Sequence, residues 1–352
     1  MAHSKPANGK QTLKRAIKRV LQILAARFGR HKRKPGQPEL LLLMYHRILP
    51  TDDPRALLEE PGMIVSPETF RLHMSLIKPL FKTMHLSQWL ELKNSGNDLP
   101  ERACAVTFDD GWADNYEFAY PILKELGIPA TIFLVSNMID KTTTFWPERL
   151  SYVVTEVSKQ PEKWSHESLR WIRQLPVSYP FDENSTQRPD REQLSEIIGA
   201  AKSLSDEEIN QRLDIIEDQL QLSNEQDSAA LLNWQQIEEM CQSDIIEVGS
   251  HTCNHIRLTD DTQSSTLTHE IVGSKQAIED RTGRAVKTFC YPNGDYSAAA
   301  KKLVEQHYIG AVTTKSGWNT TASNPYLLQR MGVHEDISND RISFLARISG
   351  WL

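Results

Sequence analysis

The chain has 352 residues, of which 39% are hydrophobic and 24% are charged, values that exclude a fibrous chain, a disulfide scaffold and wholesale disorder. The longest uninterrupted apolar run, Leu40 to Tyr45, is far shorter than the ~20 residues needed to cross a bilayer, so no membrane span is expected. The net charge of −6 is uneven: residues 1–38 hold 11 Lys or Arg and no acid, which leaves 29 basic and 46 acidic residues elsewhere. This acidic body argues against a nucleic-acid-binding protein.

The basic first segment, residues 1–38, contains a predicted amphipathic helix. Its apolar residues recur every three or four positions, at Leu13, Ile17, Val20, Leu21, Leu24 and Phe28. No continuous apolar stretch resembles a secretory signal, so none is expected. A helix of this type can lie on an anionic membrane surface, here through residues 10–34. The alternatives are a solubilising tail or an arm that contacts nucleic acid.

Beyond a linker at 35–38, strand-like and helix-like segments alternate. Short apolar runs predict buried strands at Leu40–Tyr45, Ala103–Phe108, Ala130–Val135, Ile245–Val248, Thr288–Tyr291 and Gly310–Thr313. Caps and periodicity predict helices from Ser66 towards Thr83 and at Asn115–Leu126, Asn233–Cys241, Gln263–Arg281 and Ser297–His307. This alternation predicts an α/β fold with a parallel sheet.

Residues 141–232 interrupt this alternation of strands and helices because they are polar and rich in helix signals. We therefore predict two parts of one α/β domain, 39–140 and 233–352, separated by a helical insertion at 141–232. The insertion could be a lid, a partner surface or a membrane contact. The four cysteines are scattered without a CxxC pair, so free thiols are expected at Cys104, Cys241, Cys253 and Cys290.

Three of the predicted strand ends carry unusual polar groups. The first strand end gives Asp109 and Asp110, followed by a glycine, and the second gives His251 and His255. The third gives a turn that begins at Tyr291 and continues Pro-Asn-Gly. Because the carboxyl ends of parallel strands meet at one edge, these groups are expected to share a site. Two imidazoles and a carboxylate are suitable ligands for one divalent cation.

The order TFDDG, HTxxH and Tyr-Pro resembles the polysaccharide deacetylases of carbohydrate esterase family four, which contain the NodB-homology domain. The stretches Met44–Arg47 and Pro121–Thr131 are also typical of its bacterial members. The resemblance covers roughly residues 40–140 and 233–335 and leaves the insertion unmatched. It implies a distorted (β/α) barrel of the NodB-homology type.

The resemblance also implies roles for individual residues. Asp110, His251 and His255 correspond to the ligands of one divalent metal ion, for which we expect Zn²⁺, with Co²⁺ or Ni²⁺ as alternatives. Asp109 corresponds to the general base. The backbone N–H of Tyr291 corresponds to a group that stabilises the oxyanion.

The sequence departs from the family pattern at other positions. Many members have an arginine just before the Pro-Tyr turn that orients the catalytic aspartate, and it is absent here, so Arg330 is a candidate substitute. The Asp-x-x-Asp-Trp motif has no clear match, and the stretch around Trp318 is the nearest. His334 is the candidate general acid by approximate position, and His46 is a second histidine that could reach the cavity.

Candidate substrate contacts are Arg330, Trp318 and His46. The aromatic side chains of Trp112, Trp146 and Trp318 could stack on sugar rings, although packing in the core or rim also explains each of them.

We therefore predict a metal-dependent hydrolase that removes N-acetyl groups from an amino sugar in a polysaccharide or lipid-linked saccharide and releases acetate. The expected partners are an N-acetylated saccharide or glycolipid and an anionic membrane surface, with no nucleic acid. The expected location is cytoplasmic, at the inner face of the membrane. The alternatives are a deformylase or other amide hydrolase, a 2-His-1-carboxylate iron oxygenase, and a non-catalytic glycan-binding protein with a degenerate site.

Overall fold

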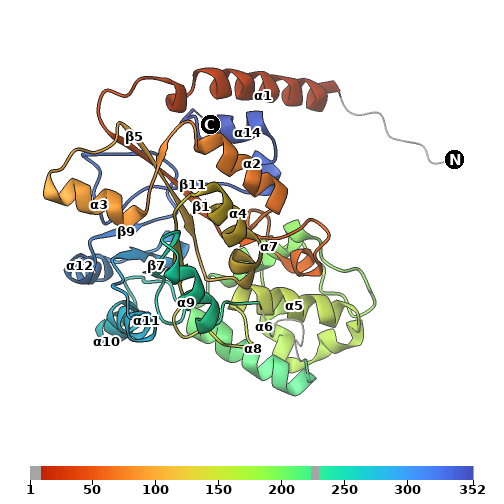
Figure 1. Ribbon diagram of the computed structural model, residues 1–352. Helices are drawn as coiled ribbons and strands as arrows, with labels where there is room; N and C mark the ends of the chain where they lie inside the picture. Colours follow the sequence, from red (N-terminus) through yellow and green to blue (C-terminus); the bar gives the residue numbers. More distant parts are fainter. Residues whose placement is uncertain (1–8, 223–229, 352) are drawn as a thin grey trace.

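The computed structural model describes residues 9–222 and 230–351. It is a mixed α/β structure in which helices surround a curled, mainly parallel sheet (Figure 1). The strands are β1 (Glu39–Tyr45), β2 (Arg47–Ile48), β3 (Ile64–Val65), β4 (Lys82–Thr83), β5 (Arg102–Phe108), β6 (Ala130–Leu134), β7 (Ile246–Ser250), β8 (Thr288–Cys290), β9 (Gly310–Val312), β10 (Asn319–Thr320) and β11 (Met331–Gly332).

The main sheet has the order β10-β1-β5-β6-β7-β8-β9, and β11 and β4 add to β1 and β5. All of these pairings are parallel except that of β10 with β1. The long β1–β5 pair runs in register from Glu39 opposite Arg102 to Tyr45 opposite Phe108. The predicted distorted barrel is therefore confirmed, and the carboxyl ends of its strands lie at one edge.

The central strands are mainly apolar because both of their faces are covered. Along β1, Leu41 and Leu43 pack in the core beneath the surrounding helices. Leu40 and Leu42 point the other way, into a second core that contains Trp89. A strand buried on both faces appears in sequence as a continuous apolar run, and that run predicted β1.

The helices connect and cover the strands. They are α1 (Gly9–Phe28), α2 (Pro67–Ile77), α3 (Leu86–Ser95), α4 (Tyr120–Leu126), α5 (Trp146–Ser158), α6 (Arg170–Arg173), α7 (Arg191–Ala201), α8 (Asp206–Leu220), α9 (Trp234–Gln242), α10 (Ser264–Thr268), α11 (Ser274–Thr282), α12 (Ala298–His307), α13 (Glu335–Ser338) and α14 (Arg341–Arg347). Within the described residues, no helix is long and apolar enough to span a membrane.

Several helices differ from the sequence prediction. The helix expected from Ser66 ends at Ile77 rather than near Thr83, and α3 was not predicted. The helix expected at Asn115–Leu126 begins with a wide π-type turn. Pro121 explains this turn, because a residue without an N–H cannot close an ordinary helical hydrogen bond. A similar wide turn separates α10 from α11.

In the predicted insertion, 141–232, the helices α5, α6, α7 and α8 enclose a hydrophobic core of their own. Hydrogen bonds and an ion pair also join the insertion to the barrel. The guanidinium of Arg191 donates to the backbone carbonyls of Glu59 and Glu60 at 3.0 and 3.1 Å. Arg257, which follows β7, forms an ion pair with Asp206 at 3.0 Å. The expected free thiols are also confirmed, because the four cysteines are buried and unbridged.

Candidate active site

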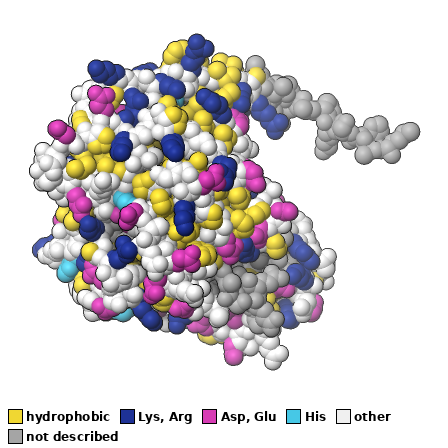
Figure 2. All heavy atoms as spheres, in the orientation of Figure 1, with side chains coloured by type: hydrophobic (Ala, Val, Ile, Leu, Met, Phe, Trp, Pro, Cys, Tyr) yellow, Lys and Arg dark blue, Asp and Glu magenta, His cyan; other side chains and the backbone are white. Residues whose placement is uncertain are grey.

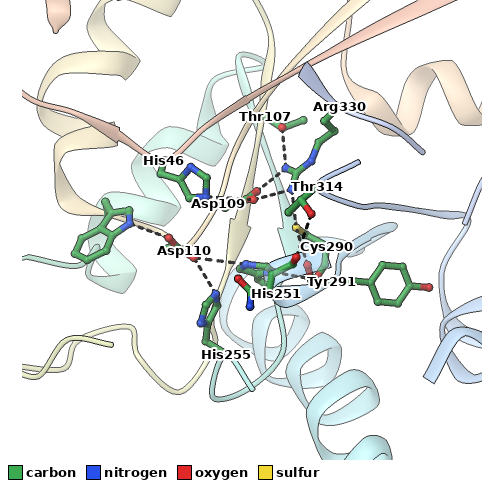
Figure 3. A network of polar contacts seen from close by, with 12 residues as sticks. His46, Thr107, Asp109, Asp110, His251, His255, Cys290, Tyr291, Thr314 and Arg330 are labelled. Carbon is green, nitrogen blue, oxygen red and sulfur yellow. Dashed lines mark hydrogen bonds and ion pairs between the residues drawn. The ribbon is translucent and has the colours of Figure 1, made fainter. Parts of the chain in front are cut away.

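Polar side chains gather where β5, β7 and β8 end (Figure 3). Asp109 and Asp110 follow β5, His251 follows β7, and Tyr291 follows β8. The parallel sheet therefore brings together groups that are far apart in sequence, at the edge where α/β proteins usually place their sites.

Asp110, His251 and His255 point towards one another. The Nε2 atoms of His251 and His255 lie 3.5 and 3.3 Å from Oδ1 of Asp110. This oxygen is buried and has no hydrogen-bond partner among the described residues. Nδ1 of His251 lies 2.8 Å from the carbonyl oxygen of Cys290. Because a carbonyl can only accept, Nδ1 carries a hydrogen, which leaves Nε2 as the ring nitrogen that faces Asp110.

These three side chains fit a divalent metal ion. Their ligand atoms lie within 4.8 Å of one another, and two imidazoles with one carboxylate are a common Zn²⁺ donor set. Burial opposes ionisation of Asp110, but its contacts with the imidazoles of His251 and His255 outweigh burial and hold the Asp110 pKa well below its usual range. Burial lowers the pKa of His255 to about 4, which keeps its ring neutral and able to coordinate.

The two histidines are carried by a loop with an unusual backbone. Thr252 and His255 have φ angles of 71° and 58°, a region that a β-branched residue such as Thr252 rarely adopts. The hydroxyl of Thr252 accepts a hydrogen bond from the His255 N–H at 2.9 Å. The buried Glu270 carboxylate accepts from the N–H groups of Cys253 and Asn254 at 2.8 and 2.9 Å. These bonds stabilise the conformation that turns both rings towards Asp110.

Asp109 faces the other way and binds an arginine. Both of its oxygens accept hydrogen bonds of 2.7 Å from Arg330. Arg330 also donates to Thr107 and to the Thr313 carbonyl. Burial raises the pKa of Asp109, but its ion pair with Arg330 outweighs burial and brings the pKa below the usual value. Arg330 thus contacts Asp109, as expected of a substitute for the arginine that many family members have before the Pro-Tyr turn. Its predicted role as a substrate contact is not supported by the geometry, because its side chain is fully buried and does not line the cavity.

Asp109, His251 and Cys290 form a second possible ligand group by distance alone. Its chemistry fits a cation poorly. Both Asp109 oxygens already bind a guanidinium, and a metal ion there would be next to that positive charge. Burial raises the pKa of the Cys290 thiol, whereas a coordinating cysteine has to be a thiolate. Asp110 is therefore better suited than Asp109 to hold a cation, and Asp109 stays paired with Arg330.

The cavity beside these residues has a volume of about 250 Å³. Its lining comes from both the barrel and the insertion: His46, Glu60, Met63, Asp109, Asp110, Phe145, Trp146, Pro147, Glu148, Lys202, Asp206, His251, His255, Arg257, Pro292, Asn293 and Thr314. A larger hollow of about 660 Å³ lies at the opposite ends of the strands and contains none of the grouped residues. The grouped polar residues therefore face the 250 Å³ cavity rather than the 660 Å³ hollow.

His46 is the third histidine of the cavity lining. It follows β1, and its Nε2 lies 3.8 Å from Oδ2 of Asp109. An imidazole is the side chain best suited to hold and release a proton near neutral pH. The structure thus brings His46 into the site.

The insertion forms one wall of the cavity. The ring of Phe145 lies 4.9 Å from that of His255, centroid to centroid. Trp146 donates its indole N–H to Asp206 at 3.0 Å, and Asp206 also accepts from the N–H of Arg257 at 2.8 Å. Sequence reasoning missed Phe145 and Asp206 because the insertion has no counterpart in the family resemblance, whereas Trp146 was named as an aromatic side chain that could stack on a sugar.

Glu148 was also missed. It lines the cavity, and its Oε2 atom is buried without a hydrogen-bond partner among the described residues. Burial, and then the charge of Glu59, raises the pKa of Glu148 well above its usual value. A protonated carboxyl group on the cavity wall can donate a hydrogen bond to a substrate oxygen.

Two predicted roles are not supported by the geometry. The backbone N–H of Tyr291 donates to the Val312 carbonyl at 3.2 Å, so it is occupied by the sheet rather than free for an oxyanion. Trp318 is 7% exposed and donates its indole N–H to the Ile348 carbonyl, which places it in the core away from the cavity. Tyr291 was expected in the site from the family's Tyr-Pro turn, and Trp318 because its stretch is nearest to the Asp-x-x-Asp-Trp motif. In the structure the Tyr291 N–H takes part in sheet pairing and Trp318 packs in the core.

The predicted general acid also lies elsewhere. His334 contacts Asp336, with 3.3 Å between its Nδ1 and the carboxylate, and it is not part of the cavity lining. Of the other predicted aromatic contacts, Trp112 is fully buried and donates to Oδ2 of Asp110 at 3.0 Å, so it orients the Asp110 carboxylate and is not exposed for stacking on a sugar. Trp146 does line the cavity.

A family model described as polysaccharide deacetylase matches residues 96–312, which is more than half of the chain. The poly-beta-1,6-N-acetyl-D-glucosamine N-deacetylase of Staphylococcus epidermidis is 30% identical over 145 residues, covering 39% of this chain and 50% of that protein. The chain matches only 34% and 50% of the length of its first two curated relatives.

Solved structures share the fold at lower sequence identity. The Streptococcus pyogenes deacetylase PplD in complex with acetate superposes with a TM-score of 0.57 and 19% identity, covering 88% of this chain and 99% of that one. IcaB from Ammonifex degensii gives a TM-score of 0.55 and 16% identity, covering 90% and 100%. These similarities extend through most of the chain, including part of the region that the sequence motifs left unmatched.

Proposed function

The chain belongs to the polysaccharide deacetylase family, and on that premise we propose that it is a metal-dependent hydrolase that removes the acetyl group from an N-acetylated amino sugar. The observation that carries the proposal is that two adjacent carboxylates have different partners. Asp110 faces two histidines, whereas Asp109 is held by Arg330 beside the same cavity. A purely structural metal site has no need of the second carboxylate.

Asp110, His251 and His255 are the residues that would hold the ion. When bound, such an ion supplies Lewis acidity, polarising the amide carbonyl and making water more acidic. Its identity is proposed to be Zn²⁺, with Co²⁺ or Ni²⁺ as alternatives.

The protein's own residues provide the proton transfers. Asp109 is ionised because its pKa lies below the usual value, so it can accept a proton as a water oxygen attacks the acetyl carbon. Arg330 fixes the position of this base. The C–N bond then breaks, and the departing nitrogen takes a proton to become an amine. We assign this donation to His46, since it lines the cavity and His334 does not.

The proposed substrate is an N-acetylglucosamine unit of a polysaccharide or a lipid-linked saccharide. The relative from Staphylococcus epidermidis is named for a β-1,6-linked polymer, which makes such oligosaccharides the first substrates to test. A formylated amino sugar would require the same proton transfers, so formate should be measured beside acetate.

The test is release of acetate and free amine from these oligosaccharides by protein supplied with Zn²⁺, Co²⁺ or Ni²⁺. We expect activity that a chelator removes, and a loss of ~10²-fold or more in Asp109→Asn. His46→Gln should lose a similar factor on the amide but little on an aryl acetate, whose leaving group departs without a proton.

Two results would contradict the proposal. If neither acetate nor formate is released from any saccharide by protein shown to contain metal, the chain is a glycan-binding protein rather than a hydrolase. If His46→Gln loses equal activity on the amide and the aryl ester, His46 is not the acid.

A further inference from the structure

Large apolar side chains are exposed at one end of the molecule. In the described part of the chain, eight such side chains are exposed, and seven of them lie on α1 or at the C-terminal end: Ile17, Val20, Leu21, Ile23, Leu24, Phe28 and Trp351. Their exposed fractions run from 43% to 56%. Figure 2 shows hydrophobic and basic side chains together along the upper edge, where α1 runs in Figure 1. A patch of this kind marks an interaction surface.

The way α1 is attached explains why this patch is exposed. The helix packs against α14 through its small residues, with Ala25 and Ala26 buried. At Gly29 the chain passes so close to Ser349 that an added Cβ would lie 2.4 Å from the serine Cβ. Arg19 forms an ion pair with Asp340 at 3.0 Å on the same side.

This orientation is the reverse of that expected for an amphipathic helix that only covers a protein core. Such a helix buries its large apolar side chains and exposes its small and polar ones. Here Ile17, Leu21, Leu24 and Phe28, spaced by three or four residues, form a stripe on the side opposite Ala26. A solubilising tail does not account for a fixed apolar stripe that points outward.

Basic residues border the stripe. Lys14 and Lys18 are exposed on one flank and Arg27 on the other, and Lys32 continues the charge beyond the helix. No acidic residue occurs in the first 38 positions. Arg33 lies 5.0 Å from the ring of Trp351, a residue type enriched where hydrocarbon meets water.

We propose that the outward face of α1, together with Trp351, docks on the surface of an anionic lipid bilayer. The apolar stripe enters the region of the headgroups, and the flanking lysines and arginines bind anionic lipid, each contributing about 1 kcal/mol near the surface. A second copy of this chain is a poorer partner, because pairing two such stripes would bring like charges together. The insertion, at the other end of the molecule in Figure 1, stays away from the lipid.

The test is co-sedimentation of the full chain with phosphatidylcholine vesicles, with and without phosphatidylglycerol. We expect binding to the mixed vesicles, weak binding to the neutral ones, and a decline as salt is raised. Leu21→Ser/Leu24→Ser should bind at least ~10-fold more weakly, and Lys14→Gln/Lys18→Gln should lose a comparable factor because each lysine contributes about 1 kcal/mol.

Ile215→Ser is the matched control, because Ile215 is 50% exposed but lies on the insertion, and it should bind like the wild type. Thermal unfolding of every variant should be unchanged, since exposed positions affect stability little. Equal binding to both vesicle types, or an equal loss in Ile215→Ser, would overturn the proposal. So would a concentration-dependent dimer that the leucine variant abolishes. Binding is measured without turnover, so it is independent of the proposed enzyme activity.

Discussion

Asp109 and Asp110 are adjacent in sequence, yet their surroundings give them different chemistry. Asp110 lies at a φ of 75°, which turns its side chain away from that of Asp109 and towards the two histidines. Asp109 instead makes a two-bond ion pair with Arg330, which is wholly buried. Sequence motifs suggested the pair of roles, but only the fold shows that Arg330 reaches across the barrel to Asp109.

The ion pair leads to a prediction for Arg330. Arg330→Met leaves a buried carboxylate without its partner, which should cost ~3–5 kcal/mol of stability. The pKa of Asp109 should rise, so the acid limb of the rate profile should move to higher pH. Urea unfolding and a pH series of acetate release are the measurements.

The double variant Asp109→Asn/Arg330→Met separates this effect from a general packing defect. Removing both charges should restore much of the lost stability, because no unpaired charge remains. If the double variant is destabilised by the sum of the two single losses, the two side chains are not coupled and Arg330 does not position the base.

At the scale of elements, α2 is joined to both β1 and α13 by one histidine. His73 is buried, its Nε2 lies 2.7 Å from the Ser338 carbonyl, and its Nδ1 lies 3.0 Å from the hydroxyl of Tyr45. The carbonyl can only accept, so Nε2 carries the hydrogen and Nδ1 accepts from Tyr45. This arrangement requires a neutral ring, and burial lowers the pKa of His73 to about 4.

Stability should therefore depend on pH through His73. Because the unfolded chain binds a proton at about pH 6.5 and the folded chain only near 4, stability should fall as the pH is lowered between these values, by up to ~3 kcal/mol from this group. In His73→Gln the part of the pH dependence of the unfolding free energy that comes from this group should disappear. Urea unfolding at several pH values would show this. The exposed His166→Gln should keep the wild-type slope, and an unchanged slope in His73→Gln would contradict the assignment.

The elements that sequence predicted best are those with a strong local signal. The apolar runs of β1 and β5 and the caps of α2 and α9 are of this kind. The cavity wall is different, because Phe145, Asp206 and Arg257 come to line one cavity only through long-range packing of the insertion on the barrel. No short stretch of sequence contains that information.

The same reason explains the misplaced site residues. His334 and Trp318 were assigned by distance along the chain from the family motifs, yet they lie outside the cavity. His46 lies in it because β1 is central in the sheet and ends beside β5. Strand order, which sequence spacing does not determine, decides which strand ends share a site.

Over the whole molecule, one curled sheet positions every group of the proposed reaction. The insertion closes one side of the cavity and α1 presents the apolar stripe at the other end (Figure 1). Catalysis and lipid binding are therefore assigned to separate surfaces. Variants of one should leave the other unchanged.

The central claim is that Asp110 is a metal ligand and its neighbour Asp109 is not. Calorimetric titration of Zn²⁺ into the metal-free wild type, Asp110→Ala and Asp109→Asn tests it most directly. We predict about one equivalent bound by the wild type and by Asp109→Asn, and binding at least ~100-fold weaker in Asp110→Ala. Loss of zinc in Asp109→Asn with retention in Asp110→Ala would contradict the account, because it would place the ion between Asp109, His251 and Cys290 instead.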